Sequence, residues 1–211
     1  MRPLPDTPWV ISADDHVVEP PHLWQDRLST RHRELGPRVV RDSCETIYDV
    51  ETRGLRYVKG GNGPVTDWWV YEDHAMPVPT VVACAGLSVE QHGVQPIAYA
   101  DMRPGCYDPS ARLADMDIGR VERSLCFPMF PGFGGRKFLE AKDRQLALRC
   151  VEAYNDWMVD EWCGGSGGRL IPLTIVPLWD PAAAAAEIRR NSARGSRAIT
   201  FPEMPDRKSV V

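Results

Sequence analysis

The stretch Ser124-Leu125-Cys126-Phe127 decides the fold, because it is a short apolar run set between two helical segments. The preceding segment, residues 111–118, follows the helix start Asp108-Pro109-Ser110 and ends at Gly119. The following segment covers roughly residues 142–163 and carries apolar side chains along one stripe: Leu146, Cys150, Ala153, Tyr154 and Trp157. A buried strand between two helices is the repeating unit of α/β proteins.

The same alternation extends in both directions from this stretch. Apolar runs at 9–14, 170–176 and 198–201 predict further strands, and residues 21–28 and 182–192 predict further helices. The runs are continuous, as expected for strands buried on both faces. No G-x-G-x-x-G motif follows the first strand, which disfavours a dinucleotide-binding sheet. We therefore predict an α/β fold, a partial (β/α)8 TIM barrel of about four βα units formed by residues 1–30 and 108–211.

Residues 31–107 interrupt this pattern and are predicted to form an insertion or cap. Residues 44–50 and 55–58 flank Glu51-Thr52-Arg53-Gly54, which is typical of a β-hairpin. Trp68-Trp69-Val70-Tyr71 is a further strand candidate, and residues 75–108 are rich in Pro, Gly and Ala. The insertion is thus expected to be mainly irregular and β.

Composition excludes several classes of protein. The chain has 211 residues, 43% of them hydrophobic, and a net charge of −4 without a basic stripe, which argues against a nucleic-acid partner. No apolar stretch approaches the roughly 18 residues of a membrane span, and no secretory h-region follows Arg2, so a cytoplasmic location is expected. The six cysteines lack a C-x-x-C pair, and Cys126 and Cys150 are interpreted as small core residues.

The candidate site lies in Asp14-Asp15-His16, at the end of the first predicted strand. Side chains alternate along a strand, so Asp14 and His16 share a face while Asp15 points away. A carboxylate beside an imidazole supplies two ligands for a divalent metal, zinc or manganese. The alternative is a surface carboxylate beside a hydrogen-bonded histidine.

Other polar residues have two interpretations each. Glu19 is the candidate catalytic residue, either as an acceptor that orients His16 or as a proton carrier, and the alternative is a helix-start carboxylate. The loop 130–135 is either an apolar wall for a planar substrate or a packed turn. Arg112 and Asp115 are expected to pair on a solvated helix face.

With these residues in view, the chain resembles the amidohydrolase-related family, which includes the aminocarboxymuconate-semialdehyde decarboxylases. The motifs that carry the resemblance are Ser12-Ala13-Asp14-Asp15-His16-Val17-Val18-Glu19-Pro20-Pro21, Leu23-Trp24, Arg112-Leu113-Ala114-Asp115-Met116-Asp117, Cys126-Phe127-Pro128, Ala153-Tyr154-Asn155-Asp156-Trp157, Gly168-Arg169-Leu170-Ile171-Pro172 and Arg197-Ala198-Ile199.

The resemblance implies a metal-dependent (β/α)8 barrel in which Asp14 and His16 match the two ligand positions of the first strand. The family's other ligands are a His after strand five and an Asp after strand eight, with a further catalytic His between them. This chain has no His after His92, so it looks like the N-terminal half of such a barrel. The implied activity is that of a metal-dependent hydrolase or decarboxylase (a carbon–carbon lyase) acting on a small carboxylated or cyclic substrate.

Two alternatives remain at this point. The chain is a catalytically inactive barrel fragment, or it is a non-enzymatic binding module whose insertion presents Trp68, Trp69 and Tyr71 to a partner. A small-molecule substrate and a homo-oligomer are the expected partners, the latter because exposed barrel edges favour self-association.

Overall fold

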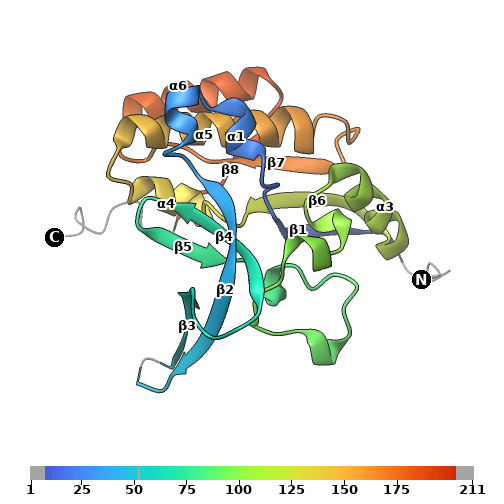
Figure 1. Cartoon of the computed structure of the whole chain (residues 1–211). Helices are drawn as coiled ribbons and strands as arrows, with labels where there is room; N and C mark the ends of the chain where they lie inside the picture. The colour runs from blue at the N-terminus through green and yellow to red at the C-terminus, as the bar shows by residue number, and fades with distance from the viewer. Residues whose placement is uncertain (1–7, 52, 203–211) are drawn as a thin grey trace.

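The computed structural model describes residues 8–51 and 53–202 and contains two four-stranded sheets. A parallel sheet has the strand order β1-β6-β7-β8, and an antiparallel sheet has the order β3-β2-β4-β5 (Figure 1). The strands are β1 (Val10–Val17), β2 (Arg38–Asp49), β3 (Gly54–Lys59), β4 (Val65–Tyr71), β5 (His74–Pro77), β6 (Val121–Pro128), β7 (Leu170–Thr174) and β8 (Ala198–Ile199).

Three helices of the parallel unit begin at aspartates, and the start at Asp108 is predicted from the sequence. Asp108, Asp143 and Asp180 each accept backbone N–H groups at the start of α3, α5 and α6. The helices are α1 (Leu23–Arg27), α2 (Thr30–Arg33), α3 (Pro109–Gly119), α4 (Arg136–Leu139), α5 (Arg144–Asp156) and α6 (Pro181–Ala193), with a π-helix (Trp157–Trp162) continuing α5. None of the helices described is long and apolar enough to cross a membrane.

The parallel sheet has one covered face and one uncovered face. Figure 1 shows α1, α5 and α6 layered on one side of β6 and β7. On β6, Ser124 and Cys126 are buried beneath the helices, whereas Arg123, Leu125 and Phe127 on the other face are more accessible. Val10 and Ile11 of β1 are 47% and 59% exposed. Among the described residues, β1 and β8 are the two edge strands of this sheet, and the sheet does not close into a barrel.

The insertion packs its antiparallel sheet against the parallel unit through aromatic side chains. The ring of Trp69 on β4 lies 5.2 Å from Trp24 and 5.0 Å from Phe130, centroid to centroid. Trp68, Trp69 and Tyr71 are at most 1% exposed. The alternative in which these three side chains are presented to a partner is therefore wrong, because they are buried within this chain.

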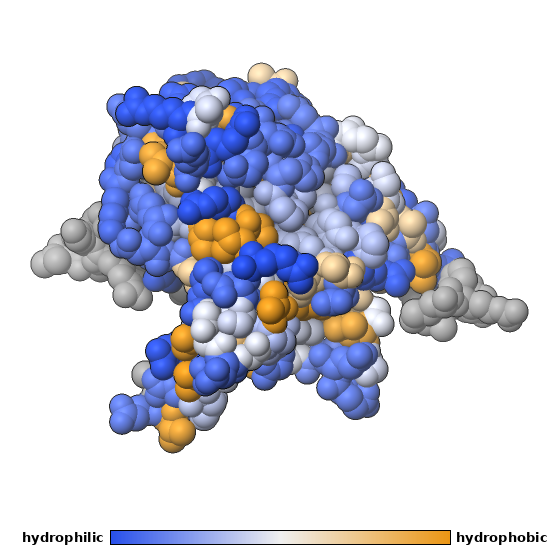
Figure 2. Space-filling view, viewed as in Figure 1, coloured by the Kyte–Doolittle hydropathy of each residue, from blue (hydrophilic) through white to orange (hydrophobic). Residues whose placement is uncertain are grey.

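The far end of the insertion projects away from the core. Figure 2 shows a protrusion formed by the β2–β3 hairpin, with apolar side chains along it. Val50 is 77% exposed and Leu55 is 40% exposed. The predicted hairpin is confirmed by the antiparallel pairing of Asp49 with Gly54, while Thr52 in its turn lies outside the described residues.

Two predicted elements end earlier in the structure than their sequence suggests. The run 170–176 is a strand only as far as Thr174, and the run 198–201 only as far as Ile199. The amide of Asn155 explains the first difference. Its Nδ2 donates to the Ile175 carbonyl (2.8 Å), and its Oδ1 accepts from the Ile175 N–H (2.9 Å). A side chain thus takes the backbone bonds that a further strand residue would use.

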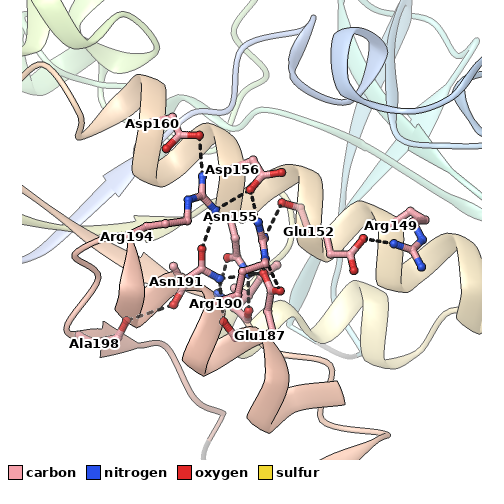
Figure 3. A network of polar contacts seen from close by, with 12 residues as sticks. Arg149, Glu152, Asn155, Asp156, Asp160, Glu187, Arg190, Asn191, Arg194 and Ala198 are labelled. Atoms are coloured by element: carbon pink, nitrogen blue, oxygen red, sulfur yellow. Dashed lines mark hydrogen bonds and ion pairs between the residues drawn. The ribbon is translucent and has the colours of Figure 1, made fainter. Parts of the chain in front are cut away.

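Figure 3 shows that Asn155 belongs to a polar network between α5 and α6. Its Nδ2 also donates to Glu187 (2.8 Å), and Glu187 in turn accepts from Arg190 (2.6 Å). Arg190 and Arg194 both reach Asp156. The Glu187 carboxylate is 4% exposed, and hydrogen bonds from Arg190, Asn155 and Asn191 keep its pKa below the usual value although burial raises it. The network holds the two helices and the end of β7 together.

Replacing this amide tests its structural role. We expect Asn155→Ala to lower the free energy of unfolding by about 3 kcal/mol, because it leaves the N–H and C=O of Ile175 buried without partners. Arg149→Ala, which removes a half-exposed ion pair with Glu152 in the same region, should cost less than about 1 kcal/mol. Urea denaturation followed by circular dichroism measures both values. Equal losses in the two variants would contradict the role given to Asn155.

Candidate active site

Asp14 and His16 lie at the carboxyl end of β1, where the active sites of parallel α/β barrels are found. In the pairing of β1 with β6, His16 is beside Phe127, whose side chain belongs to the uncovered face. The Asp14 Oδ1 and His16 Nε2 atoms are 3.7 Å apart. The structure therefore brings these two side chains together on one face of the strand.

Two aromatic rings surround the imidazole of His16. The centroid of Phe127 is 5.9 Å from it, and that of Phe133 is 5.8 Å away in an edge-on arrangement. The His16 side chain is 32% exposed, while that of Asp14 is 79% exposed. The His16 Nδ1 atom is buried and has no hydrogen-bond partner among the described residues. The imidazole thus directs Nε2, and not Nδ1, toward Asp14 and solvent.

The separation of the two donor atoms fits a shared metal ion. Two ligands about 2.1 Å from a tetrahedral ion lie about 3.4 Å apart, close to the distance between Asp14 and His16. Within the part of the chain that the structure describes, no group of three or more His, Cys, Asp or Glu side chains is arranged to hold a metal. The pair therefore supplies two donors and leaves the other positions to groups outside it.

Glu19 follows the pair in sequence but is directed into the protein. Its two carboxylate oxygens accept the backbone N–H groups of Met129 (3.0 Å) and Phe130 (2.9 Å) in the loop after β6. Tyr99 of the insertion donates its hydroxyl to the Glu19 carbonyl (2.6 Å). Glu19 is fully buried, and its carboxylate binds the loop after β6 and not the start of α1, so its interpretation as a helix-start carboxylate is wrong. No hydrogen bond between Glu19 and His16 is found among the described residues.

Burial dominates the ionisation of Glu19. Loss of hydration raises its pKa to about 7, against the lowering effect of the two backbone N–H groups and of Lys137. Burial likewise lowers the pKa of Lys137, whose ammonium lies 5.5 Å from the centre of the Phe130 ring. A carboxyl with this pKa changes charge near neutral pH and does so beneath the loop that carries Phe133.

The loop after β6 has one buried part and one exposed part. Phe130 is fully buried in the core, as expected for a packed turn, whereas Phe133 is 53% exposed beside His16. Gly134 has φ +61, and a Cβ there would lie 2.2 Å from Pro202 Cδ, so the close approach of the two segments requires glycine. One part of this loop thus anchors it, and the other part lines the candidate site.

Arg112 has a different partner from the one predicted. Its guanidinium contacts Asp15 on β1 (2.9 Å), while Asp115 pairs with Arg103. The expected Arg112–Asp115 pair on a solvated face is therefore wrong. Helical spacing places the two side chains near each other, but Arg112 is drawn inward by groups far away in sequence. No local sequence signal indicates this contact.

Comparison with known proteins agrees with this fold. The amidohydrolase family model matches residues 22–209, which is most of the chain, and so the chain belongs to the amidohydrolase family. The match begins after Asp14 and His16. No curated protein matches.

Two solved structures are similar to this chain, and the first has the same architecture. An amidohydrolase from Mycobacterium avium subsp. paratuberculosis is 23% identical, with a TM-score of 0.57 over 90% of this chain and 48% of that chain. A 2,6-dihydroxybenzoate decarboxylase from Rhizobium is 16% identical, with a TM-score of 0.42 over 92% of this chain and 38% of that one. The first similarity confirms the predicted partial barrel. The chain spans about half the length of that amidohydrolase.

The buried carboxyl makes stability depend on pH. Because the pKa of Glu19 rises from 4.5 to about 7 on folding, its contribution to stability is fully present below pH 4.5 and is lost as pH rises through 7. Relative to Glu19→Gln, the wild type should lose about 3 kcal/mol over this interval. Urea denaturation of both proteins from pH 4 to pH 8 measures the difference. Parallel pH profiles would disprove the raised pKa, and Glu161→Gln, an exposed carboxyl, is the control.

Proposed function

We propose that this chain supplies the first pair of metal ligands in a metal-dependent hydrolase or decarboxylase that acts on a small carboxylated or cyclic substrate. One observation carries the proposal: Asp14 Oδ1 and His16 Nε2 are 3.7 Å apart at the carboxyl end of a parallel strand. Membership of the amidohydrolase family supports it.

The donor atoms favour zinc or manganese. A carboxylate oxygen and an imidazole nitrogen suit these borderline divalent ions better than softer or harder ones. When bound, such an ion polarises a substrate oxygen or lowers the pKa of a bound water. In our proposal Asp14 brings negative charge to the site, and His16 binds as the neutral imidazole through Nε2.

The chain's own residues also shape the substrate site. Phe127 and Phe133 flank His16 and offer apolar surface on which a planar ring can pack. Glu19 is buried behind them and holds the loop of Phe133 through Met129 and Phe130. Its contacts support a positioning role, and its direct use as a proton carrier stays a prediction.

The proposal requires donors beyond this pair. The two atoms of Asp14 and His16 form only part of a four-ligand site, and two ligands bind a metal weakly. The similar amidohydrolase is about twice as long as this chain, and we propose that a second barrel half provides the remaining ligands. That half either continues this polypeptide or belongs to an associated chain.

Metal binding can be measured directly. We expect zinc affinity, determined by competition with a chromophoric chelator, to fall at least about tenfold in His16→Ala, because one of two donors is lost. His22→Ala is the matched control, since His22 lies at the start of α1 and contacts Glu161. The same affinity in wild type and His16→Ala would contradict the metal assignment.

A further inference from the structure

The guanidinium of Arg112 on α3 contacts three groups around the strand that carries the candidate ligands. Nη1 donates to Asp15 Oδ2 (2.9 Å), Nη2 to the carbonyl of His16 (3.1 Å), and Nε to the carbonyl of Gly105 (2.5 Å). The side chain is 12% exposed and lies against the ring of Trp162, 5.5 Å from its centre. Arg112 is thus a fixed, nearly buried cation.

Asp15 links this cation to the neighbouring strand. Its Oδ2 also accepts the hydroxyl of Ser124 on β6, directly beneath the helices. Because Asp15 alternates with Asp14 and His16, its side chain points to the covered face while theirs point to the uncovered one. The contacts of Asp15 therefore determine which way the whole tripeptide faces.

The backbone needs this support at this point. The regular pairing of β1 with β6 is interrupted between Ser12 and Asp15. Among the described residues β1 has only β6 as a neighbour, so its other edge has no strand to bond. Arg112 thus holds the carbonyl of His16 just beyond this interruption, on a strand that has a neighbouring strand on one side only.

We propose that Arg112, acting through Asp15 and the His16 carbonyl, is the positioning residue for the Asp14–His16 pair. It touches neither the Asp14 carboxylate nor the imidazole, so it is not a ligand. It fixes the backbone between them, and it neutralises Asp15 so that this third carboxylate stays on the covered face. The predicted effect of Arg112 on metal affinity rests on the proposed metal-binding function. The predicted effect of Arg112 on the backbone of β1 does not depend on that function.

The test compares Arg112→Gln with Arg103→Gln. Arg103 makes a bidentate ion pair with Asp115 of the same helix but does not contact β1, so it controls for loss of an arginine pair on α3. In metal-free protein, hydrogen exchange by mass spectrometry should show residues 14–17 exchanging about tenfold faster in Arg112→Gln and unchanged in Arg103→Gln. Equal exchange in the two variants would overturn the proposal.

Zinc affinity gives the second readout. Arg112→Gln should weaken zinc binding about tenfold, in the range found when groups supporting metal ligands are removed, and shift the visible absorption of the cobalt-substituted protein. Arg112→Lys should restore part of the affinity, because it keeps a cation near Asp15 without the planar fork. If the wild type binds zinc and Arg112→Gln binds it with the same affinity, the proposal is overturned.

The two hypotheses fail in different ways. A wild type that binds no zinc, with faster exchange in Arg112→Gln, contradicts the proposed function and leaves the positioning role standing. If Arg112→Gln does not fold, Asp15→Asn replaces it, because it breaks the same contact with less loss of volume. Where both single variants fold, the double variant should bind zinc no more weakly than Asp15→Asn, as expected for residues that act as one unit.

Discussion

The buried residue Glu19 joins the three segments on which the candidate site depends. Its two carboxylate oxygens accept the backbone N–H groups of Met129 and Phe130 after β6, and its backbone carbonyl accepts the hydroxyl of Tyr99 in the insertion. Burying a carboxylate is costly unless hydrogen bonds compensate for the lost hydration, and here both oxygens have N–H donors. The carboxyl ends of β1 and β6 are thereby fixed at one place, with the insertion attached to them.

The parallel sheet is covered by helices on one of its two faces only. Helices α1, α5 and α6 lie along the covered face, where Ser124 and Cys126 are buried. The uncovered face has no such layer, and it is there that His16 and the rings of Phe127 and Phe133 gather. A sheet packed on one side keeps its strand ends rigid while it leaves the other side free for chemistry. In a closed barrel that free side would be the interior, and in this chain it carries the rings of Phe127 and Phe133 beside the Asp14–His16 pair.

Most of the fold could be predicted because its signals are local. Apolar runs such as 124–127 and the helix start at Asp108 indicate where strands and helices begin, and the alternation of side chains places Asp14 beside His16. The contacts that the sequence could not reveal join remote segments. Arg112 lies 97 positions from Asp15, and helical spacing pointed instead to Asp115. Side-chain bonds of this kind depend on how the elements pack, which no local pattern contains.

The position of the proposed ligand pair indicates how the donors of such a site would be distributed along a chain. Two residues of one strand can bring two donors to 3.7 Å, because alternation puts them on the same face. A third donor from the same strand would need a residue beyond the strand's end or on the opposite face, and Asp15 there is already held by Arg112 and Ser124. In our proposal the further ligands therefore come from other strands. This chain spans about half of a similar amidohydrolase, and in our proposal it brings the Asp14–His16 pair and its supports, while the strands that complete the site determine the metal affinity.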